Sequence, residues 1–309
     1  MKKTSKLATY LVIPDTHFQA ALKDGKTFHE PRFCHDPEAI SLMLQFIKPY
    51  KLDGIIHIGD ICEMATISAW NKAIQREGVT QDTHGNWYEV SWQTQKQMAY
   101  NFWAYLHKKY PDAKKFQLEG NHDFWSRTFF SQPGMKQFSV EAFHNWPVWK
   151  DFNIEYHAYW GGEEDPFIFI NAPGHKGTAV LHGYNNASVK KMLRDYDNVV
   201  YGHQHKVIRE NLDSNIYERR RADCIGCLTK LKAEYNSKGG AQNGWAHAFA
   251  MIHVLSDGRT QVNVIDIGRE MTLVTEGGIV YTPMKLADID PLLAVLDLGW
   301  DCFNDISRH

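Results

Sequence analysis

Short apolar runs that end in polar or small residues recur along the first two thirds of the chain. Each run is rich in β-branched and aromatic residues and is too short for a helix, which is typical of a buried strand. The runs are ATYLVIPDTH (8–17), DGIIHIGD (53–60), AKKFQLEGNHD (113–123), TAVLHG (178–183) and NVVYGHQH (198–205). The pattern predicts five strands whose C-terminal ends carry polar side chains.

Helical periodicity fills three of the segments between these runs. The first follows Asp36, a favourable N-cap residue, and the second has a broad apolar stripe that stops before Pro111. The predicted helices cover residues 37–50, 92–110 and 187–196. Alternating strands and helices predict an α/β fold, in which the loops after neighbouring strands meet at one edge of a sheet and bind ligands there.

The last third of the chain has a different pattern. Residues 248–267 form two alternating strands around the turn Asp257-Gly258, and residues 272–282 repeat this arrangement around a pair of glycines. We therefore expect a second, mostly antiparallel sheet that packs on the first.

No linker, repeat or low-complexity tract divides the chain, so the sequence favours one domain over residues 1–283. The polar, poorly periodic stretch 63–91 is expected to be an insertion near the functional strand ends, where substrate-specific loops are common. The weakly amphipathic tail at 284–309 is expected to pack on the domain and cover its sheet, with a partner interface as the alternative.

Composition and charge exclude few classes of function. The 34 basic and 36 acidic residues give a net charge of −2, so no overall basic excess indicates nucleic acid, although a local patch or a metal site can still bind phosphates. Five cysteines, an odd number, fit a reducing compartment, and the CxxC at Cys224 and Cys227 favours a structural role over a zinc or redox role. Without a signal peptide pattern or a membrane span, the expected location is the cytoplasm.

Polar residues with metal-binding chemistry stand at all five predicted strand ends. A single histidine is more often structural than a ligand, but five such ends together favour a metal centre. Carboxylate, imidazole and amide ligands suit Mn, Fe or Zn, whereas Mg and Ca prefer oxygen alone. Seven candidate ligands are too many for one tetrahedral ion and suit two ions that share a bridging carboxylate. They are Asp15, His17, Asp60, Asn121, His182, His203 and His205.

The spacing of these residues also fits a shared centre. Residues two apart in an extended chain point the same way, so both outer residues of DTH, and both histidines of HQH, can face the metal. A glycine precedes Asp60, Asn121 and His203, and would let the backbone turn sharply before each of them.

The motifs DTH at 15, GD at 59, GNHD at 120, His182 in LHG and GHQH at 202 follow one another along the chain. In these motifs the chain resembles the calcineurin-like metallophosphoesterases, and the resemblance spans residues 12–205. It implies a two-sheet β-sandwich flanked by helices, a four-layer α-β-β-α arrangement within the α/β class. It also implies hydrolysis of phosphate esters by in-line attack of a hydroxide that bridges two divalent metal ions, with Mn expected before Fe or Zn.

The resemblance implies a role for each residue of the motifs. One ion would be held by Asp15, His17 and His205, the other by Asn121, His182 and His203, and Asp60 would bridge the two. His122 would face the leaving oxygen as an acid or transition-state stabiliser, and Asp123 would hold its ring from behind.

The motifs leave the phosphate ester open. The second motif continues as GDICEM rather than into the Asp-Arg-Gly run of the protein serine/threonine phosphatases, which disfavours a phosphoprotein substrate. The GNHD and GHxH patterns resemble nuclease-type members of the family, and the spacing around LHGYN resembles phosphoesterases encoded by bacteriophages, which would act in the host cytoplasm. A phosphodiesterase or nuclease acting on DNA or RNA is therefore expected first. The alternatives are a phosphomonoesterase for a nucleotide or other small phosphate, and a non-catalytic scaffold.

Three further features bear on the substrate. Arg127, one turn after His122, could bind a substrate phosphate, and so could the basic run Arg219–Arg221, although a structural role has equal weight for both. Aromatic residues near the metal-binding end could stack on bases, but aromatic residues more often belong to a core. They are Trp70, Trp87, Tyr88, Phe124 and Trp125. No membrane partner is expected, and the oligomeric state is open.

Overall fold

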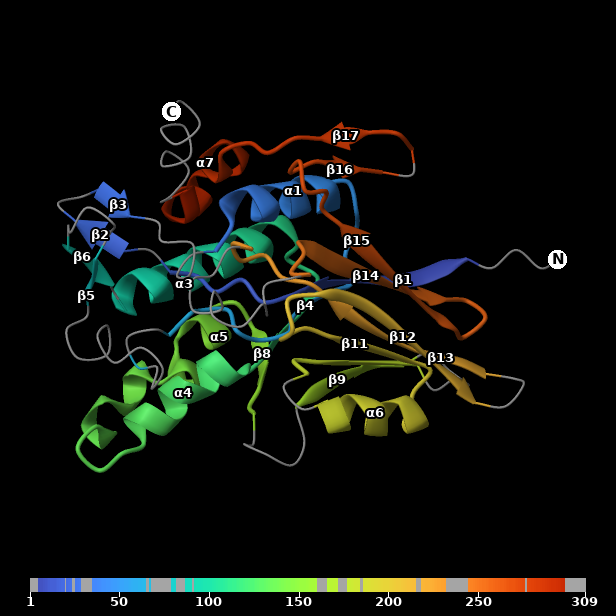
Figure 1. Ribbon diagram of the computed structural model, residues 1–309, viewed down its shortest axis with the longest axis horizontal. Coiled ribbons are helices and arrows are strands. Elements are labelled where there is room, and N and C mark those ends of the chain that lie inside the picture. Colours follow the sequence, from blue (N-terminus) through green and yellow to red (C-terminus); the bar gives the residue numbers. More distant parts are fainter. Residues whose placement is uncertain are drawn as a thin grey trace.

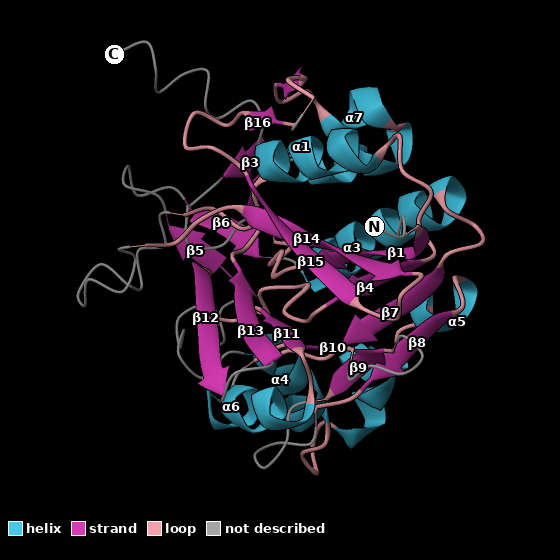
Figure 2. Ribbon diagram, turned by 90° about the vertical axis from the view of Figure 1, so that its right-hand side faces the viewer, coloured by secondary structure: helices cyan, strands magenta, loops and turns pink. Residues whose placement is uncertain are grey.

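Two β-sheets lie face to face, and helices cover the outer face of each (Figure 1 and Figure 2). The structure is a computed structural model that describes residues 5–19, 21–23, 26–28, 35–64, 67, 79–81, 87–90, 92–159, 166–171, 177–183, 186–214, 218–231, 244–275 and 277–297. This arrangement is the predicted four-layer α-β-β-α sandwich of the α/β class.

The first sheet has the strand order β15-β14-β1-β4-β7-β8. Its strands are β1 (Lys6–Ile13), β4 (Gly54–His57), β7 (Lys114–Leu118), β8 (Ile154–His157), β14 (Ala248–Leu255) and β15 (Thr260–Asp266). β1, β4, β7 and β8 are parallel, and β14 is antiparallel to both β1 and β15. Three predicted strands, β1, β4 and β7, therefore lie side by side with their C-terminal ends at one edge.

The second sheet has the strand order β12-β13-β11-β10-β9. Its strands are β9 (Phe167–Ile170), β10 (Thr178–Leu181), β11 (Asn198–Tyr201), β12 (Val207–Ser214) and β13 (Glu218–Ile225). β10, β11 and β13 are parallel, and the two outer strands are antiparallel to their neighbours. The sheet is thus mixed, and it contains the other two predicted strands, β10 and β11.

The prediction that the last third forms the second sheet is wrong. The predicted hairpin around Asp257 exists as β14 and β15, but it extends the first sheet, where Val12 of β1 pairs with Ala250. A hairpin pattern in the sequence predicts that its own two strands pair, but it does not predict which sheet they join. The almost continuous burial of β14 is what an interior strand requires, because both of its faces are covered.

Three apolar cores separate the layers. One lies between the first sheet and helices α1 (Pro37–Ile47) and α3 (Trp92–Lys109), one between the two sheets, and one between the second sheet and α6 (Asn186–Asp195). Side chains alternate along β1, so Leu11 and Ile13 pack in the helix-side core while Val12 packs between the sheets. Each such fully buried side chain stabilises the fold by about 1.5–3 kcal/mol.

The remaining helical elements are α4 (Asn121–Phe130), α5 (Val148–Asp151), α7 (Leu286–Ile289) and the 3-10 helices η3 (Lys136–Glu141), η4 (Phe143–Asn145) and η6 (Pro291–Asp297). In the C-terminal segment, Leu286, Leu293 and Leu296 are buried in the helix-side core, so this segment packs on α1 and α3. Residues 298–309 lie outside the described residues. No described helix has both the length and the apolar character needed to cross a membrane.

The hairpin predicted at 272–282 is present as β16 (Leu273–Val274), which pairs with β17 (Val280–Tyr281). Four other short strands were not predicted. They are β2 (Ala21–Lys23), β3 (Lys26–Phe28), β5 (Val79–Gln81) and β6 (Trp87–Val90), which form a sheet of order β3-β2-β6-β5. β5 and β6 fall within the stretch 63–91, which was predicted as an irregular insertion. Strands of three or four residues are too short for alternation to reveal them.

Candidate metal centre

The loops that follow β1, β4, β7, β10 and β11 meet at one edge of the two sheets. Parallel strands bring their C-terminal ends to the same edge, so these loops converge although they are far apart in the sequence. All seven predicted ligands lie there, on the loops themselves or, for Asn121, at the first residue of α4.

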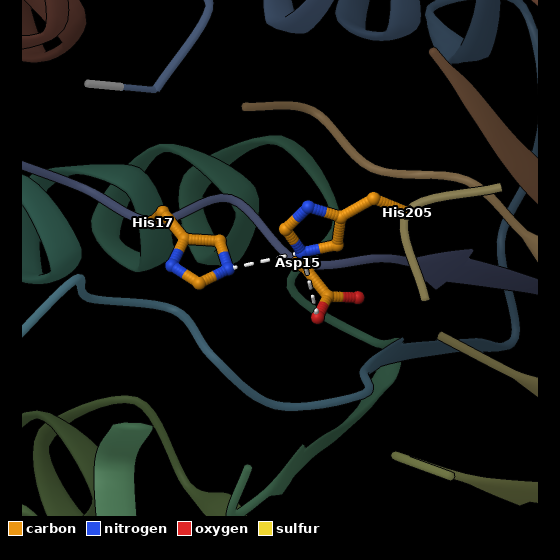
Figure 3. A group of neighbouring side chains, drawn as sticks. All are labelled: Asp15, His17 and His205. Atoms are coloured by element: carbon orange, nitrogen blue, oxygen red, sulfur yellow. Dashed lines mark hydrogen bonds and ion pairs between the residues drawn. The ribbon is translucent and has the colours of Figure 1, made fainter. Parts of the chain in front are cut away.

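The first cluster of side chains is Asp15, His17 and His205, which Figure 3 shows facing one another. All three residues are buried. His17 Nε2 lies 3.2 Å from His205 Nε2, which in turn lies 3.5 Å from Asp15 Oδ1. Only one of two facing imidazole nitrogens can carry the proton of a hydrogen bond between them, whereas a divalent ion accepts both lone pairs and the carboxylate.

The second cluster is Asp60, His182 and His203, whose potential ligand atoms all lie within 4.8 Å of one another. His182 Nε2 is 3.3 Å from Asp60 Oδ2 and 3.1 Å from Asn121 Oδ1, so the amide belongs to this cluster as well. The same Asp60 oxygen is 3.9 Å from His17 Nε2 in the first cluster. Asp60 therefore lies between the two clusters, which is where a bridging carboxylate has to be.

The donor set fits a pair of divalent transition-metal ions. It combines the two carboxylates Asp15 and Asp60, the Asn121 amide and four imidazoles in a largely buried space. Mixed nitrogen and oxygen donors of this kind suit Mn, Fe or Zn better than Mg or Ca.

Four of these residues have a left-handed backbone conformation. The φ angles are 49° at His17, 51° at Asp60, 62° at His203 and 56° at His205. This conformation costs a non-glycine residue about 1–2 kcal/mol, and such strain is concentrated at functional sites. The sharp turns direct these side chains toward the shared centre.

Two glycines allow the carboxylates to approach the backbone closely. A Cβ at Gly120 would overlap the Asp60 carboxylate, and a Cβ at Gly202 would overlap the carboxylate of Asp15. Gly120 has an ordinary φ of −87°, which any residue can adopt. A glycine is needed there because a side chain would not fit, and not because of the sharp turn that the sequence suggested. Gly59, with a φ of 113°, is the glycine that meets the expected turn.

Backbone amides hold both carboxylates in place. The N–H of His122 donates to Asp60 Oδ1 at 2.8 Å, and the N–H of His203 donates to Asp15 Oδ2 at 3.1 Å. Hydrogen bonds to a carboxylate favour its charged form. The first amide lies in the first turn of α4, next to the predicted ligand Asn121, and the second belongs to the predicted ligand His203, so the segments that carry the ligands orient one another.

The electrostatics of the centre keep its carboxylates ionised. Burial would raise the pKa of Asp60, but the neighbouring histidines, His182 foremost, together outweigh burial and hold this pKa well below its usual range. Burial also opposes charge on His182, yet Asp60 raises the pKa of His182 to about 10. Burial, reinforced by His182, lowers the pKa of His203 to about 4, so this ring is neutral, which is the form of imidazole that binds a metal.

A family model for calcineurin-like phosphoesterases matches residues 8–207, a range that contains all seven predicted ligands and His122. The chain belongs to this family. Its two mixed sheets flanked by helices are the fold that this family implies, and its buried histidine and carboxylate clusters are consistent with the two-metal site that the family resemblance implies.

Solved structures similar to this calcineurin-like phosphoesterase are distant in sequence. A metallophosphoesterase from Sphaerobacter thermophilus is 12% identical with a TM-score of 0.39, over 94% of this chain and 99% of the other. A dimetal phosphatase from Danio rerio is 12% identical with a TM-score of 0.41, over 85% and 100%. Vacuolar Protein Sorting 29 from Cryptosporidium parvum is 12% identical with a TM-score of 0.38, over 86% and 100%. No curated protein sequence matches the chain.

The predicted acid of this phosphoesterase, His122, lies beside both clusters. Its ring is 4.7 Å from the His17 ring and stacks on Trp125 at 4.1 Å. Its Nδ1 is 2.7 Å from the carbonyl oxygen of Glu63, which fixes the proton on Nδ1. Asp123 was expected to hold this ring, but it accepts instead from the N–H of Gly120 and caps α4. The hydrogen bond that orients the His122 ring at Nδ1 therefore comes from Glu63, in the loop after β4.

Glu63 is a further residue of the site, which no motif in the sequence indicated. Its Oε2 lies 2.6 Å from His17 Nδ1 and 3.7 Å from His122 Nδ1, and the residue is buried. Against the effect of burial, this carboxylate, together with Asp60 and Asp15, raises the pKa of His17 to about 9. The available signal was a carboxylate three residues after Asp60, at the start of the stretch predicted as an insertion.

His57, also missed, lies fully buried beneath the centre. Its Nε2 is 3.1 Å from Thr16 Oγ1, and its Nδ1 accepts from the Gly59 N–H at 3.3 Å and is 3.3 Å from Gln117 Nε2. Burial lowers the pKa of His57 to about 3, so the ring is neutral. It connects the loops after β1 and β4 to strand β7.

Arg127 forms an ion pair that the sequence did not reveal. Its guanidinium lies 2.8 Å from Glu119 Oε2, donates to the Tyr159 carbonyl and lies over the Phe124 ring at 4.9 Å. Because Glu119 is completely buried, removing Arg127 would leave an unpaired buried carboxylate. A phosphate contact by Arg127 stays a prediction.

The predicted basic run lies on β13 and supports the fold at the described side chains. Arg220 donates to the carbonyls of Leu193 and Arg194, and Arg221 donates to Asp223 at 2.6 Å. The side chain of Arg219 lies outside the described residues. Arg220 and Arg221 are thus engaged by protein acceptors rather than presented to a polyanion.

The aromatic and cysteine predictions have mixed outcomes. Trp125 does lie at the centre, through its contact with His122. Trp70, and the side chains of Trp87 and Tyr88, lie outside the described residues. Cys224 and Cys227 are buried and free, and neither belongs to a metal-binding cluster among the described residues.

Proposed function

We propose that this chain is a phosphoesterase that uses two divalent metal ions. The observation that carries the proposal is Asp60 Oδ2, which lies between a cluster of Asp15, His17 and His205 and a cluster of Asn121, His182 and His203. We assign one ion to each cluster and Asp60 to both. When bound, the ions would neutralise phosphate charge and lower the pKa of a bound water toward neutrality. Mn is the first metal to test, then Fe and Zn.

The chain's own residues would position the ester and move a proton. With Nδ1 facing the Glu63 carbonyl, the other ring nitrogen of His122, Nε2, remains for the substrate. A proton on Nε2 would pass to the leaving oxygen as the ester bond breaks, which is general acid catalysis. Stacking on Trp125 restricts the orientation of this ring.

We propose phosphodiesters, with DNA or RNA first, as the substrate class. The GNHD and GHQH motifs and the absence of an Asp-Arg-Gly run after Asp60 favour this class over phosphoproteins. Trp125, next to His122, offers an aromatic surface for a base. The engagement of Arg220 and Arg221 by protein acceptors favours the second candidate, a nucleotide or other small phosphate monoester.

Hydrolysis of bis-p-nitrophenyl phosphate and p-nitrophenyl phosphate, with Mn²⁺ and with chelator, tests both proposals. We expect Mn-dependent cleavage that favours the diester, and a loss of about 100-fold or more in Asp60→Asn. Asp257→Asn makes the same chemical change in an exposed turn and should leave turnover unaltered. Faster cleavage of the monoester would instead favour the second candidate, a nucleotide or other small phosphate monoester, as the substrate. Absence of activity on both esters would favour the non-catalytic scaffold.

A further inference from the structure

Trp245 lies beside the first cluster of the metal centre, although it belongs to none of the motifs. Its ring is 4.3 Å from the ring of His205 and meets it edge to face. The ring of His17 contacts the rings of both His205 and His122, and Trp125 stacks on His122. A tryptophan therefore lies at each end of a row of three histidine rings.

The backbone of Trp245 is fixed to the loop that carries His205. Trp245 forms an isolated antiparallel bridge with Lys206, and the N–H of Ala246 donates to the carbonyl of His205 at 2.9 Å. The carbonyl of Ala246 accepts from the N–H of Cys227 at 3.1 Å. The loop that carries a proposed metal ligand thus also sets the position of Trp245.

The side chain of Trp245 is only half-buried. Among the described residues it packs in none of the three apolar cores, whereas Trp125 packs against the core on the helix side of the first sheet. An indole normally stabilises a fold by burial, so a tryptophan outside the cores contributes less in that way. Partly exposed aromatic rings in such positions are the surfaces on which proteins stack unpaired bases.

Lys206 places a positive charge next to Trp245. Opposite residues of an antiparallel bridge have their side chains on the same face, so these two side chains are neighbours. The Lys206 side chain also lies 3.8 Å from the point where a Cβ of Gly244 would be. Lys206 forms no ion pair with a carboxylate of the described residues, so its ammonium group can bind a phosphate.

We propose that Trp245 and Lys206 form a subsite for one nucleotide of a single-stranded nucleic acid, next to the phosphate that the metal centre would cleave. The indole stacks on the base, and the ammonium group binds the flanking phosphate. Neighbouring bases cover both faces of a base inside a duplex, so the subsite selects single strands. This inference rests on the proposed phosphodiesterase function and specifies the form of its substrate.

Fluorescence anisotropy of the Mn²⁺-loaded chain tests the stacking on Trp245. The probes are short single strands with phosphorothioate linkages, which resist cleavage: oligothymidylate, oligouridylate and an abasic strand with the same number of phosphates. We expect the wild type to bind a base-bearing strand about tenfold more tightly than the abasic strand. The tighter of the two base-bearing strands distinguishes DNA from RNA.

Trp245→Leu keeps an apolar side chain beside His205 but removes the aromatic face. It should reduce the preference for the base-bearing strand about fivefold or more, whereas Trp245→Phe should retain most of this preference. Phe169→Leu, which changes an exposed ring on β9, is the matched control and should bind all three strands as the wild type does.

Lys206→Gln should weaken the binding of all three strands, because it removes a phosphate contact and leaves the base contact. The slope of log K against log salt should become shallower by about 0.7, the value for one phosphate of a single strand, while Trp245→Leu should leave this slope unchanged. Lys114→Gln, at the exposed start of β7 and so at the far end of this strand from the metal centre, is the matched control.

The subsite is refuted if the wild type binds the abasic strand as tightly as the base-bearing strands, if Trp245→Leu keeps the preference, or if Lys206→Gln keeps the slope. Hydrolysis of bis-p-nitrophenyl phosphate by the wild type distinguishes this failure from that of the proposed function. Cleavage without a base preference would refute the subsite alone, and a base preference without cleavage would refute the proposed function alone. Thermal unfolding establishes that each variant is folded, and the wild-type comparison and Lys206→Gln decide if Trp245→Leu is not.

Discussion

The side chain and backbone of Glu63 connect a predicted ligand with the predicted acid. Its Oε2 lies 2.6 Å from His17 Nδ1, and its carbonyl oxygen lies 2.7 Å from His122 Nδ1. A carboxylate behind a metal-binding imidazole fixes the ring tautomer and makes the other nitrogen a better ligand. We therefore infer that Glu63 acts through His17 and is a positioning residue.

Glu63→Gln should weaken the binding of Mn²⁺ by about 10- to 100-fold, because the amide retains a hydrogen bond to His17 but loses the charge that supports its ring. Isothermal titration calorimetry measures this affinity directly and does not depend on the substrate. Glu270→Gln, at an exposed position, is the matched control and should bind Mn²⁺ as the wild type does. Equal affinities in the two variants would reduce Glu63 to a packing residue.

The sequence predicted the seven clustered side chains because their motifs have short, fixed spacings at strand ends. Glu63 was not predicted as a site residue because it begins a stretch without periodicity, where nothing in the sequence relates its carboxylate to His17. Arg127 shows the converse limit. Its position one turn after His122 was correct, but its buried partner Glu119 could be identified only from the packing of the folded chain.

At the scale of elements, the junction between β7 and α4 sets the distance between the loops of the centre. Gly120, the N-cap of α4, lies against the Asp60 carboxylate, and the next two residues are the proposed ligand Asn121 and the proposed acid His122. Any side chain at Gly120 would push the start of α4 away from the loop after β4. The glycine therefore keeps the two loops close together.

Gly120→Ala should lower diester hydrolysis by about 100-fold, because a displacement of order 1 Å in reacting groups costs about that much. The alanine is compatible with the backbone, whose φ is −87°, so the loss would come from displacement of Asp60. Gly134→Ala is the matched control, since a Cβ there meets no atom within 4 Å. The hydrolysis rate and the Mn²⁺ affinity of both variants are measured side by side. Equal values for Gly120→Ala and Gly134→Ala would contradict this explanation.

Element prediction succeeded where a pattern was local and failed where it was not. Helices α1, α3 and α6 and the five strands were predicted because each contains its own periodicity, and the N-cap of α1 is visible in Asp36, which accepts from the N–H groups of Glu38 and Ala39. Helix α4, which is as long as α6, was not predicted. The sheet that contains β14 and β15 was misassigned because the choice depends on pairing with β1, more than 230 residues earlier in the chain. Pairing between strands that are far apart in the sequence cannot be recognised from the residue pattern of a short segment.

At the scale of the whole molecule, one buried histidine ties the C-terminal segment to the body of the fold. His35 Nε2 donates to the carbonyl of Leu296 at 2.7 Å, and the backbone of His35 forms an isolated antiparallel β-bridge with Thr229. Burial lowers the pKa of His35 to about 4, below its value of about 6.5 in an unfolded chain. The folded state therefore holds this ring neutral while the unfolded state takes up a proton below about pH 6.5.

His35 should make the molecule less stable in acid. Stability linked to this ring is complete above pH 6.5 and falls as the pH drops toward 4, by at most about 3 kcal/mol. His35→Gln keeps a donor for Leu296 but does not titrate, so its free energy of unfolding should fall less steeply between pH 6.5 and 4. Urea unfolding at several pH values measures the two slopes, with His157→Gln, at a partly exposed ring, as the control. Parallel slopes for wild type and His35→Gln would show that other groups govern acid unfolding.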